Sequence, residues 1–355
     1  MSDAASLAAE RDPVGIKAFS AEELGDALAE LGQPRYRTKQ IVRWLYQQRA
    51  TSFDQMTDLP AALRETLAGR FALPYPEIIQ RQVSADGTRK YLLRLADGIT
   101  VEAVGLPAGD RLTVCFSTQA GCAMGCTFCA TGQSGLTRSL APGEMVDQLN
   151  VVAADFGERV TNAVAMGQGE PFANYDSVLA ALRFMNHEEG LGIGARHLTV
   201  STCGLIPQIM RFAEEPEQFT LAVSLHSAVQ ATRDRLMPGV KGFKLPELRA
   251  ALVAYGEKTH RRPSLEYALA DGANDSEAEL SALTTFCRGM LVHVNLIPVN
   301  PVAGTGLSRS QTSRVAHFAE HLAAAGIEVS VRAERGTDID AACGQLRQRV
   351  EAEGS

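Results

Sequence analysis

The chain has 355 residues, of which 45% are hydrophobic and 21% charged, so it can bury a large core without disulfide bonds. Its net charge of -7 excludes a uniformly basic nucleic-acid-binding protein. No segment is long and apolar enough to cross a bilayer, and residues 1–11 lack the apolar run of a secretory signal. We therefore expect a cytoplasmic protein with no membrane partner, in which the seven cysteines serve as ligands or reactive thiols.

Residues 1–75 are predicted to form a small helical accessory domain. Ser20 and Glu23 have the spacing of a capping box, and Ile41 and Leu45 follow at helical spacing. The same helices carry four basic side chains close together: Arg35, Arg37, Lys39 and Arg43. On charge alone, this cluster is as consistent with a solvated helix face as with a contact to RNA.

Residues 76–108 are predicted to form a short antiparallel β meander that leads into the rest of the chain. Three β-rich runs are separated by Asp86-Gly87 and Asp97-Gly98, and both dipeptides are typical of hairpin turns.

From residue 109 to 347, strand-like apolar runs alternate with helical stretches. The predicted strands are residues 112–116, 163–166, 198–201, 221–225, 265–269, 292–297 and 329–331. This alternation indicates an α/β fold with parallel βα units, and six or more units predict a partial (β/α)6 TIM-like barrel whose function lies at the C-terminal strand ends. A doubly wound sheet would give a similar pattern. Residues 348–355 are expected to be a polar tail.

Three cysteines, Cys122, Cys126 and Cys129, lie in one loop after the first predicted barrel strand. Their thiolates could ligate three irons of a cubane cluster and leave the fourth iron open for a substrate. A zinc site would need a fourth ligand, and the chain from Cys129 to His187 holds no further cysteine or histidine. A thioredoxin-like role for Cys126 and Cys129 would leave Cys122 unexplained. We favour the iron-sulfur cluster.

The CxxxCxxC loop in this position resembles that of the radical-SAM superfamily, and longer stretches resemble the RlmN/Cfr family of RNA adenine methyltransferases. The stretches that carry this resemblance are residues 36–46, 102–104, 115–119, 121–132, 167–171, 201–204, 224–226, 294–301 and 335–345. They are spread over most of the chain, and the C-terminal stretch around Cys343 is more specific than the cysteine loop.

The resemblance implies a 4Fe–4S cluster on the cysteine loop, S-adenosylmethionine (SAM) as cosubstrate, and methylation of adenosine at C2 in 23S rRNA and in tRNA. Cys343 matches the cysteine that carries the methyl group, Cys115 the thiol that resolves the enzyme–RNA adduct through a transient disulfide, and Glu102 the base. Without the resemblance, Cys115 would be read as a buried strand residue and Glu102 as a surface carboxylate. A low-potential donor such as flavodoxin is the implied source of electrons.

The resemblance also implies a set of SAM contacts. Gly169 and Glu170 match a loop that holds the SAM amino group, and glycine there allows a close backbone approach. On the glycines alone, a simple strand-to-helix turn is an equal explanation. Further matching positions, which contact the SAM ribose and carboxylate in the family, are Ser201, Ser224, Leu225, His226 and Asn300. Taken alone, His226 would be read as a core histidine.

Some residues depart from the family pattern: Gln168 stands where methionine is usual, Ala173 where leucine is usual, and Cys203 where serine is usual. The cluster, Cys115, Cys343 and Glu102 positions are retained, so the reaction type is better supported than the RNA target. A Cfr-like methylation of C8 and another radical-SAM reaction stay open as alternatives, as does a metal-binding module without catalysis. Cys203 and Cys287 receive no functional role and are expected to be structural.

Overall fold

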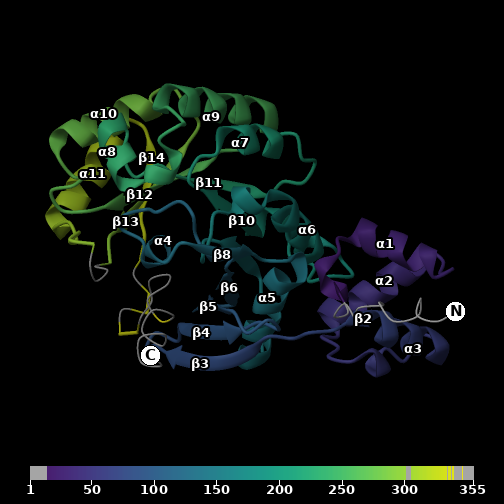
Figure 1. The fold of residues 1–355 in the computed structure, drawn as a ribbon. Helices are drawn as coiled ribbons and strands as arrows, with labels where there is room; N and C mark the ends of the chain where they lie inside the picture. Colours follow the sequence, from purple (N-terminus) through teal and green to yellow (C-terminus); the bar gives the residue numbers. More distant parts are fainter. Residues whose placement is uncertain (1–13, 301–304, 334, 337, 340–345, 347–355) are drawn as a thin grey trace, which may run out of the picture.

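The computed structural model describes residues 14–300, 305–333, 335–336, 338–339 and 346. Figure 1 shows a small helical unit beside a larger unit in which helices cover a twisted sheet. None of the described helices is long and apolar enough to cross a membrane.

The helical unit is bounded by two short strands, β1 (Val14–Gly15) and β2 (Phe71–Ala72), which pair in parallel. Between them lie η1 (Ile16–Ala18), α1 (Ala21–Glu30), α2 (Tyr36–Val42), the π-helical η2 (Arg43–Gln47), η3 (Phe53–Gln55) and α3 (Ala61–Arg70). The predicted capping box begins α1: the Glu23 N–H donates to Ser20 Oγ at 3.2 Å, and the Ser20 N–H donates to the Glu23 carboxylate at 2.8 Å. Ile41 and Leu45 are buried, as their spacing predicted.

The predicted meander is confirmed as three antiparallel strands, β3 (Glu77–Val83), β4 (Arg89–Arg94) and β5 (Thr100–Ala108). Gly87 and Gly98 occupy their two turns with φ of 83° and 84°, a conformation in which glycine is favoured because it lacks Cβ. β5 then pairs antiparallel with β6 (Arg111–Cys115), so the meander and the larger unit share one sheet.

The seven predicted barrel strands are present within a residue or two of their expected bounds. After β6 come β9 (Asn162–Ala165), β10 (Leu198–Thr202), β11 (Thr220–Ser224), β12 (Ser264–Leu269), β13 (His293–Pro298) and β14 (Glu328–Val331), all paired in parallel. Each strand adds beside its predecessor, so the order from β6 to β14 never reverses. A doubly wound sheet requires such a reversal, and that alternative is therefore wrong. The sheet stays open, with β3 and β14 at its edges.

Helices and one extra hairpin connect these strands. The helices are α4 (Ala130–Gln133), α5 (Pro142–Phe156), α6 (Tyr175–Asn186), α7 (Ile206–Phe212), α8 (Gln230–Leu236), α9 (Leu245–Thr259), α10 (Glu277–Cys287) and α11 (Thr312–Ala324), with short η4 (Pro171–Asn174), η5 (Ala195–His197) and η6 (Pro238–Val240) turns. The hairpin of β7 (Gln119–Gly121) and β8 (Leu136–Ser139), which flanks the cysteine loop, was not predicted. Its strands are too short to leave a period in the sequence.

The two faces of the sheet differ in chemistry because strand side chains alternate between faces. Val114, Val200 and Val223 are fully buried in the core that the helices cover. Their neighbours on the other, concave face are often polar, for example Ser201 and Ser224, and are only half-buried. The concave face is therefore the face available for a ligand.

A buried ion pair joins the helical unit to the larger one. Lys17 of η1 places Nζ 2.8 Å from both carboxylate oxygens of Asp147 in α5, and both side chains are 4% exposed. Gly143 allows this approach, because a Cβ there would lie 2.2 Å from Lys17 Cβ. The packing between the two units thus depends on a small residue and a buried charge pair.

We expect Asp147→Ala to lower the free energy of unfolding by about 3–5 kcal/mol, because it leaves the buried Lys17 ammonium without its counter-charge. Glu30→Ala, which removes the exposed partner of Arg70, is the control and should cost about 1 kcal/mol or less. Urea unfolding followed by circular dichroism measures both. Equal losses in the two variants would contradict a structural role for the Lys17 pair.

Candidate active site

The cysteine loop lies between β7 and β8 and is fixed at both ends. The Cys122 N–H donates to the Gly135 carbonyl at 2.8 Å, and Gly121, with φ of 79°, lies so close that a Cβ would be 2.0 Å from that oxygen. Farther along, the Thr127 N–H donates to the Leu236 carbonyl of α8 at 2.9 Å, and the Gly239 N–H donates to the Met124 carbonyl at 2.9 Å. The loop is therefore held by backbone contacts that do not depend on the cysteine side chains.

The three loop cysteines face the same small region. Burial, together with the like charges of the nearby Cys126, Cys129 and Glu170, raises the pKa of the Cys122 thiol to about 12. Thiolate formation here needs a cation, which an iron cluster provides. In the part of the chain that the structure describes, no three Cys, His, Asp or Glu side chains gather closely enough to hold a single metal ion. In a cubane, each thiolate binds a different iron.

Cys203, to which the sequence assigned no role, lies in this region. It follows β10, and its thiol hydrogen-bonds with the Cys126 thiol, which lowers the pKa of Cys126. Its backbone links two charged side chains, because the N–H donates to the Glu170 carboxylate at 2.6 Å and the carbonyl accepts from Arg233 Nη2 at 2.6 Å. The sequence could not predict this position of Cys203, because it depends on the pairing of β10 with β9 in the sheet.

Gly169 and Glu170 form a tight turn after β9. Gly169 has φ of 101°, and a Cβ there would lie 2.6 Å from Gln119 Cβ, so the turn requires glycine. The Glu170 carboxylate is fully buried and accepts from the Phe172 N–H at 2.9 Å as well as from Cys203. Burial raises the pKa of Glu170. Such a carboxylate is well placed to bind a cation, because burial strengthens charge pairing.

Gln168 beside this turn is also buried, at 1% exposure. Its backbone carbonyl accepts from the Thr118 and Gln119 N–H groups, whereas neither polar atom of its side-chain amide has a partner among the described residues. Buried amides are normally hydrogen-bonded. The departure from methionine at this position therefore adds polarity beside Glu170.

Cys115, Glu102 and Lys90 share the concave face of three adjacent strands. Val104 is the register partner of both Cys115 and Lys90, which places Glu102, two residues earlier, on the same face. Diagonal neighbours of this kind are about 7–8 Å apart. The face is opposite to α5, which packs against Gly105. Lys90, Glu102 and Cys115, which come from three different strands, therefore lie close together on one face of the sheet.

Glu102 is not a surface carboxylate. It is 3% exposed and lies 3.1 Å from Nζ of Lys90, which is fully buried. A buried carboxylate is stabilised as an anion only when it is paired, and Lys90 supplies the paired charge. Lys90 is a residue that sequence reasoning missed, because one basic side chain in a strand carries no distinct signal.

Ser117 links Glu102 to the turn that holds Glu170. Its hydroxyl donates to the Glu102 carbonyl at 2.6 Å and accepts from the Gln168 N–H at 3.0 Å. The meander and the turn after β9 are therefore connected through one buried hydroxyl.

The remaining predicted SAM positions differ in their placement. Ser201 and Ser224 are half-buried at the C-terminal ends of β10 and β11. The Leu225 side chain is fully buried in the core, so only its backbone could meet a ligand on the concave face. Asn300 is exposed just after β13, and Cys343 lies outside the described residues.

His226 is held in one orientation. Its φ is 54°, its Nδ1 accepts from the Ala268 N–H at 2.9 Å, and its carbonyl accepts from the Asn274 amide at 2.6 Å. Burial, followed by the charge of Arg233, lowers the pKa of His226 to about 3, so the ring is neutral at physiological pH. Because Nδ1 accepts, the proton is on Nε2. The ring also packs edge-on against Phe128 of the cysteine loop, at 4.6 Å between centroids.

Comparison with known proteins places this site in a family. A family model described as "Ribosomal RNA large subunit methyltransferase N-terminal domain" matches residues 14–73, and that of the "Radical SAM superfamily" matches residues 116–244. A protein of Symbiobacterium thermophilum named "Probable dual-specificity RNA methyltransferase RlmN" is 46% identical over 99% of this chain and 96% of its own. The chain belongs to the RlmN family.

One further relative and one solved structure agree. A protein of Lysinibacillus sphaericus with the same name is 45% identical over 95% of this chain and 90% of its own. The crystal structure of a radical SAM methyltransferase from Sphaerobacter thermophilus is 45% identical, covers 94% of this chain and 99% of that chain, and has a TM-score of 0.87. The RNA methyltransferase family and the mixed α/β fold that the sequence predicted are confirmed.

The cofactors of RlmN proteins are a 4Fe–4S cluster and SAM, as their radical SAM membership implies. The geometry of this chain fits both. Three neighbouring thiols, of which Cys122 and Cys126 are buried, match the demand of a cubane for soft ligands, and Glu170 is a buried acceptor for an ammonium. An iron-sulfur cluster is therefore favoured over a zinc ion at the cysteine loop.

The neutral state of His226 predicts a pH dependence of stability. Its folded pKa of about 3 lies below the ordinary value of 6.5, so unfolded chains bind a proton that folded chains do not. Stability should therefore fall as the pH falls below 6.5, by about 1.5–2 kcal/mol down to pH 5. The variant His226→Asn, in which asparagine tolerates the positive φ, should lose about 1.5–2 kcal/mol less stability over the same pH range. Urea unfolding of both proteins at pH 6.5 and at pH 5 measures the two losses of stability. Equal losses in the unmodified protein and in His226→Asn would contradict the prediction.

Proposed function

We propose that this chain methylates C2 of an adenosine in 23S rRNA, with tRNA as a second substrate, through a methylated Cys343. Membership of the RlmN family supports the RNA substrate class. The observation that carries the mechanism is the shared face of Cys115 and Glu102, next to the cysteine loop. A thiol and a carboxylate are the two groups that release of a thiol-bound base requires.

Cys122, Cys126 and Cys129 would hold the cluster, and Glu170 would hold the SAM ammonium. When bound, the cluster supplies the electron that splits SAM and so generates a radical able to remove hydrogen from a methyl group. Ser201, Ser224, His226 and Asn300 would contact the rest of SAM along the strand ends. The neutral His226 ring offers Nε2–H as a donor, since Nδ1 is taken by the Ala268 N–H.

Cys343 would first accept a methyl group on its sulfur. After loss of one hydrogen atom, that methyl carbon would bond to C2 of the adenine and join the RNA to the protein through a thioether. The adduct would then give up one electron, for which the oxidised cluster would be the acceptor. Ordinary polar transfer is unsuited to C2, because this carbon lies between two ring nitrogens and has no lone pair.

Cys115 would then release the RNA. Its thiolate attacks the Cys343 sulfur, and a disulfide joins the two cysteines as the bond between that sulfur and the methylene carbon breaks. The released carbon keeps the electron pair of that bond and takes up a proton to become the methyl group. Cys115 is 7% exposed at the last residue of β6, on the concave face, so Cys343 must approach it from that face.

Glu102 would take the ring proton during release. Lys90 keeps the carboxylate paired and oriented toward the concave face while it accepts that proton. A base in this step must be held within reach of the ring, and the buried pair on adjacent strands limits its movement.

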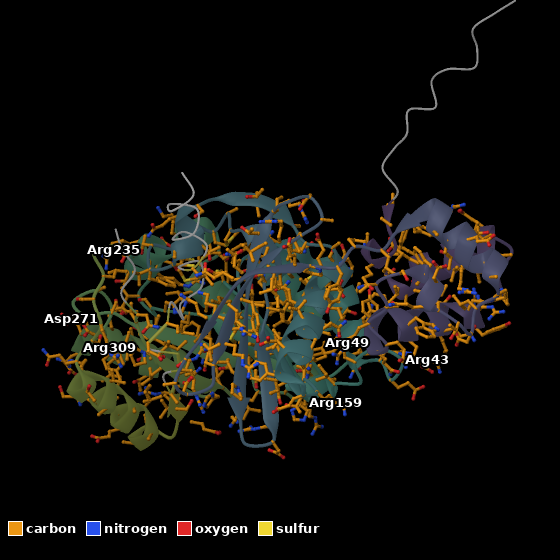
Figure 2. The ribbon with its side chains drawn as sticks, turned by 90° about the horizontal axis from the view of Figure 1, so that it is seen from below. Arg43, Arg49, Arg159, Arg235, Asp271 and Arg309 are labelled. Carbon is orange, nitrogen blue, oxygen red and sulfur yellow. The ribbon has the colours of Figure 1, made fainter. Side chains whose placement is uncertain are left out.

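Residues 1–75 would act as an RNA-binding accessory domain, with residues 76–108 as the link to the barrel at 109–347. Tyr36 is 57% exposed, and the Arg37 guanidinium lies 5.0 Å from the centre of its ring, which gives a stacking surface with a positive charge. Arg43, Arg49 and Arg159 are labelled near the junction of the two units in Figure 2. An acidic chain can bind phosphate through such local cations.

The central test is to reconstitute the cluster anaerobically, add SAM with a labelled methyl group and a 23S rRNA fragment, and analyse both products by mass spectrometry. We expect label on the Cys343 peptide and on C2 of adenosine. Label on C8 would show a Cfr-like reaction instead. Label on neither protein nor RNA, in a reduced and fully loaded enzyme, would refute the proposal.

We expect Cys115→Ala to accumulate a covalent protein–RNA adduct, because the thioether then has no resolving thiol. Denaturing gels with radiolabelled RNA detect the adduct. Cys287→Ala is the matched control, since Cys287 is a buried cysteine of α10 in the core and away from the site. Normal turnover by Cys115→Ala would remove Cys115 from the mechanism.

A further inference from the structure

Arg233, in α8, is a fully buried cation for which neither the sequence nor the mechanism above provides a role. An isolated charge is costly to bury, and buried guanidinium groups are normally paired with carboxylates. Arg233 therefore needs an anion close by.

The hydrogen bonds of Arg233 account for only part of its donor capacity. Nη2 donates to the Cys203 carbonyl at 2.6 Å, while Nε and Nη1 are buried without a partner among the described residues. A guanidinium has five N–H donors and normally uses most of them when buried. The orphan groups indicate that a counter-charge belongs to the site.

The surroundings of Arg233 contain carboxylates that are engaged elsewhere. Glu170 accepts from the Phe172 and Cys203 N–H groups, and Asp234 accepts from the Gln230 amide at 2.7 Å. His226, another titratable neighbour, is neutral near pH 7. No described carboxylate is bonded to Arg233.

The cysteine loop is the remaining source of negative charge. Cys203, whose carbonyl binds Nη2, also contacts the Cys126 thiol. Cys126 packs against Leu236 and Met237, which lie three and four residues after Arg233 at the end of α8. Gly204 keeps the guanidinium close, because a Cβ there would lie 3.0 Å from Nη2.

We propose that the counter-ion of Arg233 is the iron-sulfur cluster, and that this buried cation stabilises the reduced cluster. The inference rests on the proposed assignment of Cys126 as a cluster ligand. Thiolates and sulfides make the cluster site negative, and reduction adds one more electron to it. A fixed positive charge in a low-dielectric environment offsets that added charge and raises the reduction potential.

The test is an anaerobic redox titration of the reconstituted holoenzyme, without SAM or RNA, followed by electron paramagnetic resonance. We expect Arg233→Met to lower the equilibrium constant for cluster reduction by about tenfold or more, which is about 59 mV for a one-electron couple. Arg233→Lys, which keeps the charge, should stay much closer to the unmodified enzyme. Iron content and the absorption spectrum are measured for each variant before titration.

Arg235→Met is the matched control, because Arg235 lies on the same helix but donates to the Ala273 carbonyl at the surface, where Figure 2 labels it. We expect it to leave the potential unchanged. An unchanged potential in a fully loaded Arg233→Met would overturn the proposal. If Arg233→Met does not fold or does not load the cluster, Arg233→Lys decides. A drop of about tenfold in its equilibrium constant for cluster reduction, or a folded Arg233→Lys protein that fails to load the cluster, would also overturn the proposal.

These outcomes are distinct from failure of the proposed function. A zinc-loaded or colourless protein would remove the cluster itself, and unlabelled Cys343 would remove the methyl transfer, whereas a loaded cluster with an unshifted potential removes only the role of Arg233.

Discussion

The anchoring of the cysteine loop to α8 and the β7–β8 hairpin is the constraint on which the active site depends. Backbone hydrogen bonds from Cys122 and Thr127, together with the close approach at Gly121, fix the loop at the C-terminal end of β6 and β9. Because backbone groups hold the loop, the thiols remain available as ligands. A cluster bound there would lie next to Glu170, which the strand order brings to the same end.

The two faces of the open sheet have different roles. One face packs against helices and stabilises the fold, and the other is available for ligands and chemistry. Side chains on the outer face pack beneath the helices, whereas the concave face carries Cys115, Ser201 and Ser224. The antiparallel meander extends this face by one more group of strands, and so adds Glu102 and Lys90 to it. The meander therefore contributes to the proposed active site as well as linking the two units.

Several charged side chains are buried in and around this site. Glu102 is paired with Lys90, Glu170 is held by backbone N–H groups, and Arg233 has donors left over. A globular core would normally exclude such groups or pair them fully, because their desolvation is costly. Their presence near the cysteine loop fits a site that holds a charged cluster and a sulfonium cosubstrate, and the proton acceptor proposed above.

The sequence by itself determined the strand and helix order, the hairpin turns, the capping box at Ser20 and the cysteine loop, because these depend on local periodicity, turn residues and spacing. Tertiary structure alone decided that the sheet is singly wound, that Glu102 is buried against Lys90, and that Cys203 and Arg233 adjoin the loop. Those features follow from strand register and long-range packing, which bring together residues whose separation in sequence carries no periodic signal.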